Sequence, residues 1–388
     1  MSGHDLFCQP RRIRHGVALT LVFASVLVAG AATGSFEEPT GTSPAAGPAN
    51  RAGRDDDDVT EAAARAMAAG TSPVEAAERA VSRSGDRWGA VYSRAEYQEF
   101  EDALDGRYTG VGLSARRERD GRIEVSRVQP GSPAATAGIR TGDRLRSVDG
   151  VDVDGRPVTE VVSLLRGDAD DAPAGTRVTL GLQRATRTWD AVVRRARLST
   201  DPVTVRRLGV GVTVIRVAAF TKGAGALVRG AADRAPRGDG IVLDLRGNSG
   251  GLVAEAVTAA GAFLDGGLVA TYDVKGRQRA LHAGADGDTT RPMVVLVDGG
   301  TMSAAELLTG ALQDRGRAVV VGTRTFGKGS VQMPSRLPDG SVAELTVGHY
   351  RTPSGRSVDG HGITPDLEAD RQALERAETV LGGLGDAS

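Results

Sequence analysis

Residues 297–314 read VDGGTMSAAELLTGALQD, which predicts the end of an apolar strand, a glycine turn and then a helix from Ser303 to Asp314. The N-terminus of a helix presents unpaired N–H groups and the positive end of the helix dipole. If a serine at this position acted as a nucleophile, these groups would stabilise the negative charge that develops during acyl transfer. A serine is also a common helix cap without any chemical role. Taken alone, this stretch leaves Ser303 open as a nucleophile or as a cap.

A second stretch, residues 244–252, reads DLRGNSGGL and lies between a predicted buried strand and a predicted helix. Glycine N–H groups at such a turn suit an oxyanion. Residues 247–251 also resemble the GDSGG segment around the nucleophile of chymotrypsin-like proteases. That chemistry needs a histidine base, and no histidine occurs between His15 and His282. The sequence therefore argues against Ser249 as the nucleophile.

The third stretch, residues 322–332, reads GTRTFGKGSVQ and follows an apolar run at 318–321. A lysine between two glycines is ordinarily a surface charge. Lys328 could act as a general base only if burial lowered its pKa, with a hydroxyl within hydrogen-bonding reach. A serine and a lysine on separate turns can therefore form a dyad if the fold brings the turns together.

In this order, the three stretches resemble the carboxyl-terminal processing (tail-specific) peptidases, serine peptidase family S41. The family pattern Leu-Arg-x-Asn-x-Gly-Gly matches 245–251, the Ser-Ala-Ser-Ala-Ser-Glu motif aligns with 301–306, and Phe-Gly-Lys-Gly-x-Val-Gln matches 326–332. The resemblance covers most of residues 86–382. This chain departs from the family pattern at Ser249, Thr301, Met302 and Ala305, and none of these changes removes a reacting group.

The resemblance implies roles for particular residues. Ser303 corresponds to the nucleophile and Lys328 to the general base, and Gln332 would hydrogen-bond and orient Lys328. Further implied residues are the oxyanion-hole donors and two acidic positions with supporting or structural roles: Gly250 or Gly251 with Ala304, and Glu306 and Asp314. The implied fold is an α/β protease core of the ββα-spiral (ClpP/crotonase-like) type. No metal or organic cofactor is implied.

Residues 108–197 have a different pattern of short strands, a short helix and a longer helix at 158–166. The segment SPAATAGIRTGDRL at 132–145, followed by VDG, resembles the PDZ domains of bacterial proteases. In such a domain, Gly110, Val111, Gly112 and Leu113 would capture a peptide C-terminal carboxylate, and the peptide would add as a strand beside Leu113. A GxG pair alone also fits a simple turn.

Composition and pattern suggest six segments along the 388 residues. These are a signal peptide or anchor, a linker, an N-terminal helical segment, a PDZ domain, an S41 protease domain and a tail: 1–34, 35–55, 56–107, 108–197, 198–382 and 383–388. In the helical segment, helices are expected at 60–69, 73–83 and 94–104. The acidic run 55–58 is expected at the start of the first of these helices, where the dipole favours it.

The first 34 residues carry three arginines and then an apolar run at 17–32, the pattern of a secretory signal. Cleavage and retention as a single membrane anchor both remain open, and both place the remaining chain outside the cytoplasm. The 48 basic and 49 acidic side chains nearly balance, which gives no reason to expect nucleic acid as a partner. Cys8, the only cysteine, excludes an intramolecular disulfide.

The sequence therefore predicts an extracytoplasmic serine endopeptidase that recognises free C-termini of proteins or peptides, acting as a homo-oligomer or with an adaptor. Three alternatives remain. The chain is a catalytically silent PDZ scaffold, a hydrolase of small acyl substrates, or a histidine-dependent enzyme. The histidines available for the last alternative are His282, His349 and His361.

Overall fold

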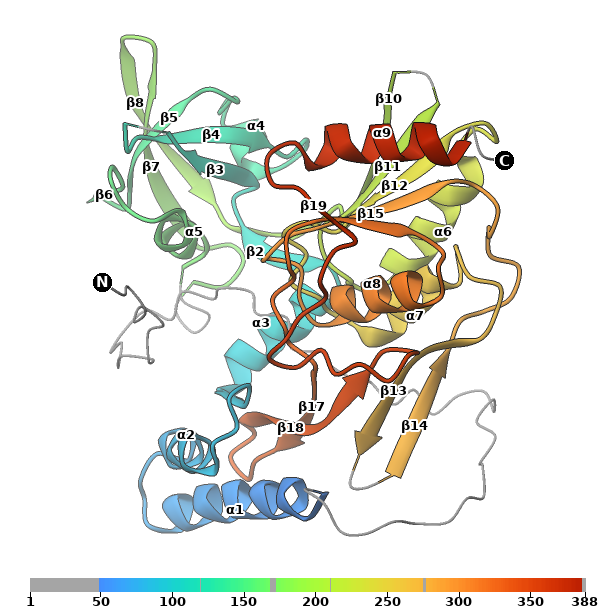
Figure 1. Cartoon of the computed structure of the whole chain (residues 1–388). Coiled ribbons are helices and arrows are strands. Elements are labelled where there is room, and N and C mark those ends of the chain that lie inside the picture. The colour runs from blue at the N-terminus through green and yellow to red at the C-terminus, as the bar shows by residue number, and fades with distance from the viewer. Residues whose placement is uncertain (1–48, 119, 168–171, 210, 275–276, 386–388) are drawn as a thin grey trace, which may run out of the picture. The chain divides into compact units, whose positions relative to one another are not determined.

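The computed structural model describes residues 49–118, 120–167, 172–209, 211–274 and 277–385 (Figure 1). The chain divides into two compact units, residues 107–199 and residues 49–106 together with 200–385. The predicted signal or anchor and most of the predicted linker lie outside the described residues. Within the described residues, no helix is both long and apolar enough to cross a membrane.

The unit of residues 107–199 is built on a sheet of order β3-β4-β5-β7-β8, with β6 paired to β5 and a separate β2–β9 pair. The strand and helix bounds are β2 Arg107–Gly110, β3 Leu113–Arg117, β4 Ile123–Val128, α4 Pro133–Thr136, β5 Arg144–Val148, β6 Val151–Asp152, α5 Val158–Arg166, β7 Arg177–Arg184, β8 Arg187–Arg194 and β9 Ala196–Ser199. Alternate residues of β7 point into the core with Val161 and Leu165 of α5. The predicted helix at 158–166 is confirmed.

The larger unit contains a six-stranded sheet of order β10-β11-β12-β15-β16-β19, in which only β10 runs antiparallel to its neighbour. The strand bounds are β10 Val203–Leu208, β11 Val212–Val217, β12 Gly240–Asp244, β15 Met293–Val297, β16 Val319–Gly322 and β19 Leu367–Glu368. The inner strands β12 and β15 are buried along their whole length. Parallel strands covered on both faces read as continuous apolar runs, which explains why the sequence predicts them well.

Helices cover both faces of this sheet. One face packs against α6 Ala224–Arg234, α7 Val253–Ala260 and α8 Ala304–Asp314, and the other against α9 Ala373–Gly385. Figure 1 shows α9 on one side of the strands and the other three helices on the opposite side. Because the inner strands are parallel, the turns that follow β12, β15 and β16 lie at one edge of the sheet.

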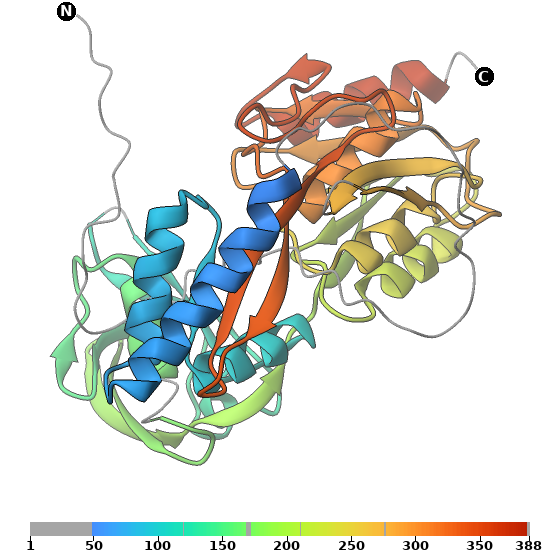
Figure 2. The ribbon, with the colours of Figure 1, turned by 90° about the horizontal axis from the view of Figure 1, so that it is seen from below.

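A second sheet has the order β1-β18-β13-β14, with β17 paired to β18. Its strands are β1 Ala90–Tyr92, β13 Leu268–Val274, β14 Arg277–His282, β17 Ser330–Arg336 and β18 Val342–Arg351. Helices α1 Ala49–Ala68 and α2 Pro73–Ser84 pack through a small apolar cluster on β18 and on Leu337, which follows β17, and Figure 2 shows them beside these strands. The pairing of β1 with β18 ties the N-terminal segment to the C-terminal half of the chain.

The expected helices at 73–83 and 94–104 are confirmed as α2 and α3 Arg94–Leu104, each with a serine cap. The position expected for the acidic run is wrong. Helix α1 begins at Ala49 and has no acidic residue in its first turn, so Asp55–Asp58 lie within the helix. The six helical residues before the run include two alanines and two arginines, which have high intrinsic helix propensity, so the helix starts upstream of the run.

Candidate active site

Ser303 sits at the turn between β15 and α8, where the backbone is forced into an uncommon conformation. Its φ of 55° lies in the left-handed region, and its ψ of −118° takes it outside the usual left-handed well. Such strain concentrates at functional sites. The turn is fixed against the β12 loop, because the Thr301 hydroxyl donates to Leu245 O (2.9 Å) and Met302 N donates to Asn248 O (2.9 Å).

The glycine loop after β12 lies directly against this turn. A Cβ at Gly250 would come within 2.9 Å of Ser303 Cβ and 3.1 Å of Met302 O, so only glycine fits. The Gly250 N–H donates to Asn248 Oδ1 (2.9 Å), so the nearby asparagine already engages it. The N–H groups of Gly251 and Ala304 form no hydrogen bond with the described residues. Of the two expected glycine donors, the geometry therefore favours Gly251.

Lys328 is buried in the loop that follows β16, with 1% of its side chain exposed. Glycine at 329 is required there because a Cβ would lie 2.4 Å from Asp359 N. Burial lowers the pKa of Lys328 to about 8. The negative charges of Glu344 and Asp86 act in the opposite direction, because they favour the ammonium form. Its Nζ lies 5.2 Å from the centre of the Trp88 ring. A lysine in this state is neutral far more often than a surface lysine.

Glu306, on the first turn of α8, joins the serine turn to the lysine loop. Oε2 accepts from the backbone N–H groups of Ser303 (2.9 Å) and Lys328 (2.8 Å), and Oε1 accepts from Gly327 N (2.7 Å) and the Thr325 hydroxyl (2.5 Å). Burial raises the pKa of Glu306, and these four hydrogen bonds oppose the rise. The sequence predicted a supporting role for Glu306 but not this bridge.

Tyr350 of β18 makes a second bridge that the sequence did not indicate. Its hydroxyl is fully buried and lies 2.9 Å from Ser303 O and 3.1 Å from Lys328 O. A tyrosine in an apolar strand reads as core, so only the fold reveals its contact with both turns. Glu306 and Tyr350 together hold the two proposed reacting residues in fixed relation through their backbones.

The hydrogen bond expected between Gln332 and Lys328 is not seen in this structure. Gln332 Nε2 instead donates to the hydroxyls of Ser330 (2.7 Å) and Thr346 (3.3 Å). Its Oε1 is buried and has no hydrogen-bond partner among the described residues. The reason is local: a β-bulge between Val331 and Gln332 sets the Gln332 amide opposite Thr346 of β18.

Two acidic residues act on Lys328 from elements far away in sequence. Asp86, in the turn between α2 and β1, accepts from the Thr346 hydroxyl and the Thr346 N–H, both at 2.7 Å. Glu344 of β18 is fully buried, and neither carboxylate oxygen has a partner among the described residues. Burial raises the pKa of Glu344 to about 7 despite the charge of Lys328. No local motif pointed to either residue.

The other candidates from the sequence lie outside this constellation. Asp314 ends α8, pairs with Arg356 and accepts from Ser354 N (2.9 Å), which is a structural role. The three described histidines are exposed and form no hydrogen bond with Ser249 or Ser303: His282, His349 and His361. Among the described residues, no group of three or more His, Cys, Asp or Glu side chains could hold a metal ion.

In the unit of residues 107–199, the GVGL segment forms the turn between β2 and β3. Gly112 has φ 82°, and a Cβ there would lie 2.2 Å from Ser132 Cβ. The carbonyl groups of Val111 and Gly112 accept from Ala134 N (2.9 Å) and Gln129 N (2.8 Å), while the N–H groups of Val111 and Gly112 form no hydrogen bond with described residues. Strand β3 is at the edge of its sheet. Free N–H groups beside an open edge suit a peptide carboxylate.

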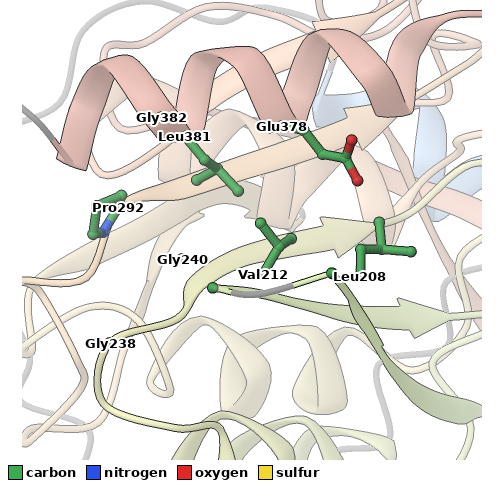
Figure 3. Close-up of a pocket in the computed structure, with 10 residues that line it drawn as sticks. Leu208, Val212, Gly238, Gly240, Pro292, Glu378, Leu381 and Gly382 are labelled. Carbon is green, nitrogen blue, oxygen red and sulfur yellow. The ribbon is translucent and has the colours of Figure 1, made fainter.

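A cavity of about 550 Å³ lies elsewhere, between α9 and the starts of β11 and β12 (Figure 3). Gly240 begins β12 and Pro292 precedes β15, so the cavity is at the N-terminal ends of the parallel strands. Ser303 and Gly251 follow the C-terminal ends of the same strands, at the opposite edge of the sheet. The cavity is therefore separate from the candidate site.

Comparison with known proteins gives consistent matches. Residues 211–369 match peptidase family S41, and residues 124–184 match the PDZ domain family. The chain is 33% identical over 301 residues to a carboxy-terminal-processing protease of Bartonella bacilliformis, covering 75% of this chain and 68% of the relative. It is 31% identical over 290 residues to the carboxy-terminal processing protease CtpA of Bacillus subtilis, covering 74% and 61%.

Among solved structures, the photosystem II D1 C-terminal processing protease is similar with a TM-score of 0.51 and 30% identity, covering 81% of this chain and 86% of that one. The chain thus spans about two thirds of the length of the curated relatives cited. The S41 match contains the Ser303 and Lys328 turns, and the PDZ match contains β5 to β7 and most of β4 but not the GVGL turn or β3. On these grounds, the chain belongs to the serine peptidase family S41 and carries a PDZ domain.

Proposed function

We propose that this protein is a serine endopeptidase that uses a Ser303–Lys328 dyad and selects protein substrates by their C-termini through the PDZ domain. Two costly features support the proposal: a serine in a strained backbone position and a lysine buried where its pKa falls to about 8. Glu306 and Tyr350 connect the two turns. Strain and buried charge are typical of functional sites.

The proposed reaction is acyl transfer. Neutral Lys328 takes the proton of the Ser303 hydroxyl while Oγ attacks the peptide carbonyl carbon. The N–H groups of Gly251 and Ala304 stabilise the oxyanion that forms. The Lys328 ammonium group then gives its proton to the leaving amine, and the peptide bond breaks. Water attacks the acyl-enzyme while Lys328 takes one of its protons. Lys328 then returns a proton to Ser303 Oγ as the ester bond breaks, which releases the acid product and restores the dyad.

The substrate class is inferred from the PDZ domain and from the relatives, which are carboxy-terminal processing proteases. A reader of C-termini suits protein or peptide substrates better than small acyl compounds. The GVGL turn offers free N–H groups at Val111 and Gly112 for a terminal carboxylate. A catalytically silent PDZ scaffold is the alternative, and the retained Ser303, Lys328 and Gln332 speak against it.

Further parts of the proposal rest on the sequence. The apolar run at 17–32 supports export, followed either by cleavage or by anchoring to the membrane, and so an extracytoplasmic location. The family resemblance supports a ββα-spiral core.

The direct test is labelling of the purified protein with a fluorophosphonate, followed by mapping of the modified peptide. We expect the adduct on Ser303, together with cleavage of an unfolded protein that ends in an apolar tail. The matched control substrate carries a C-terminal amide, which lacks the carboxylate, and we expect it to be cleaved more slowly. An adduct on Ser249 would move the nucleophile to the glycine loop. Tail binding without any adduct or cleavage would support the scaffold alternative.

The Trp88 ring gives a prediction about pH. Burial is the largest cause of the low pKa of Lys328, and this ring covers its ammonium group. Trp88→Ala admits water, which favours the charged form and raises the lysine pKa; loss of the cation–π contact opposes this by about 1 kcal/mol, less than the desolvation removed. The charges of Glu344 and Asp86 still favour the ammonium form. The acid limb of kcat/KM should therefore move to higher pH.

At pH 7 we expect an approximately tenfold loss for each unit by which the lysine pKa rises. The loss should disappear above about pH 11, where even a hydrated lysine is largely neutral. Trp189→Ala is the matched control, since this second tryptophan packs with arginines of the other unit. An equal loss at every pH would show that Trp88 acts on folding or substrate binding instead.

A further inference from the structure

A chain of hydrogen bonds runs from the N-terminal segment to Gln332. The Thr346 hydroxyl donates a hydrogen bond to Asp86 Oδ1 (2.7 Å), and the Thr346 backbone N–H donates to Asp86 Oδ2 (2.7 Å). The Thr346 oxygen in turn accepts from Gln332 Nε2 at 3.3 Å. Asp86 also accepts from Trp88 N (3.0 Å), so it holds the turn that carries the ring over Lys328.

The chemistry of a hydroxyl gives this chain a direction. A threonine hydroxyl has one proton to donate and lone pairs to accept. Because an ionised carboxylate only accepts hydrogen bonds, the Thr346 hydroxyl donates its one hydrogen to Asp86, which leaves the Thr346 oxygen as an acceptor. The Gln332 amide must then turn its nitrogen toward Thr346 and its oxygen away. Ser330 also accepts from Gln332 Nε2 (2.7 Å), but its hydroxyl could equally donate and so does not fix the orientation.

The oriented amide leaves one atom unmatched. Gln332 Oε1 is buried and has no hydrogen-bond partner among the described residues. A buried acceptor without a partner is costly, and such an atom calls for an explanation. Lys328 is an equally buried cation with three N–H donors. The Asp86 charge acts on Lys328 and the Trp88 ring lies 5.2 Å from its Nζ, so chain and lysine share one buried region.

We propose that Asp86 is a positioning residue for the catalytic lysine, acting through Thr346 to orient the Gln332 amide so that its oxygen receives an N–H of Lys328 during the reaction. The inference rests on the proposed dyad and adds a part of the chain that the catalytic motifs do not contain. With its donors directed to Gln332, the neutral amine keeps its lone pair for the Ser303 proton. The N-terminal segment thereby completes the active site, 260 residues away in sequence from Thr346.

The first test is Thr346→Val compared with Thr346→Ser, both close in volume to threonine. Thr346→Val removes the fixed acceptor, so the Gln332 amide is no longer oriented. We expect kcat on a short peptide to fall by about 10- to 100-fold with KM unchanged, the usual effect of losing an outer partner of a functional group. Thr346→Ser restores the hydroxyl and should retain activity within about threefold. A structural role for the methyl group alone would give the reverse order.

The second test is a double-mutant cycle with Asp86→Asn. The amide cannot replace both carboxylate oxygens as acceptors, so the direction of the chain is lost and kcat should fall by a similar factor. If Asp86 acts on kcat only through the hydrogen bonds to Thr346 and Gln332, adding Thr346→Val to Asp86→Asn lowers kcat no further. Independent effects that multiply would overturn the proposal, as would a kcat of Thr346→Val within twofold of the native value.

A matched pair elsewhere in the same unit controls for stability. Asp239 accepts a hydrogen bond from the buried Thr213 hydroxyl at 2.7 Å. This pair lies near the starts of β11 and β12, at the edge of the sheet opposite the candidate active site. Asp239→Asn and Thr213→Val should lower the unfolding temperature but leave kcat unchanged. If Asp86→Asn does not fold, the Thr346 comparison still decides the question. Activity of a variant that lacks the Ser303 hydroxyl would refute the dyad itself. Full activity of Thr346→Val would refute only the role of the hydrogen bonds from Asp86 to Gln332.

Discussion

Ser303→Ala and Lys328→Met will each lower kcat at pH 8 by at least about 10⁴-fold, and the double variant will be no slower than either one. In the proposed dyad the serine supplies the attacking oxygen and the lysine removes its proton, so neither group functions without the other. Lys328→Arg should be as inactive, because a guanidinium group does not give up its proton near neutral pH. Hydrolysis of a short peptide and of a tailed protein both measure the effect.

Controls separate chemistry from folding. Lys328→Met replaces a buried ammonium group by an apolar chain of similar length, which is often neutral or stabilising, so the inactive variant should unfold at or above the native temperature. Ser249→Ala and Lys222→Ala are the matched serine and lysine controls. Ser249 lies in the glycine loop, and Lys222 is exposed. Both should keep native activity, and the dyad is wrong if Ser303→Ala cleaves as fast as they do.

The sequence predicts best the parts of this fold that are set by local pattern. Strands β12 and β15 are continuous apolar runs because both faces of a parallel sheet are covered. Helix α8 is recognisable from the glycine turn that precedes it and from its apolar spacing. The three motifs of the proposed site fall on the turns that follow β12, β15 and β16, at one edge of the sheet. That placement is why their proximity could be expected without a structure.

The remaining features depend on pairing between distant segments. Strand β1 joins β18 across some 250 residues, with Ala90 opposite Glu344. Nothing in the local sequence around either strand indicates the other. The hairpin β13–β14 was not predicted, because Arg277–His282 is a mostly exposed strand without an apolar face. The same distant pairing brings Asp86 and Glu344 to Lys328, so the electrostatics of the site could not be derived from its motifs.

Within the site, the sequence indicated residue types but not orientations. Gly250 and Gly251 both looked like oxyanion donors, and only the bond from Gly250 N to Asn248 separates them. The resemblance implied that Gln332 hydrogen-bonds to Lys328, but the amide nitrogen of Gln332 donates to Ser330 and Thr346 instead. A β-bulge and one distant aspartate decide that direction, and neither has a sequence signature.

The second large effect is expected at Glu306. Its two oxygens accept four hydrogen bonds, from three backbone N–H groups and the Thr325 hydroxyl. Glu306→Gln keeps the size but offers one oxygen and one NH₂ group. The NH₂ group then faces two backbone N–H donors if it replaces Oε2, or the Gly327 N–H if it replaces Oε1. Each buried donor left without an acceptor lowers the free energy of unfolding by about 1–3 kcal/mol. We expect the unfolding free energy to fall by about 3 kcal/mol and kcat to fall by at least about 100-fold.

The loss of kcat should exceed what partial unfolding explains, because Glu306 sets the distance between the Ser303 and Lys328 backbones. The matched control is Glu255, whose carboxylate accepts from the N–H groups of Gly223 (2.9 Å) and Gly225 (2.8 Å) at the start of α6. Glu255→Gln should also destabilise the protein while leaving kcat unchanged in the folded state. If Glu306→Gln is as stable and as active as the native protein, the bridge has no part in holding the dyad. If it is destabilised but fully active once folded, Glu306 serves the fold alone and Tyr350 suffices to align the two turns.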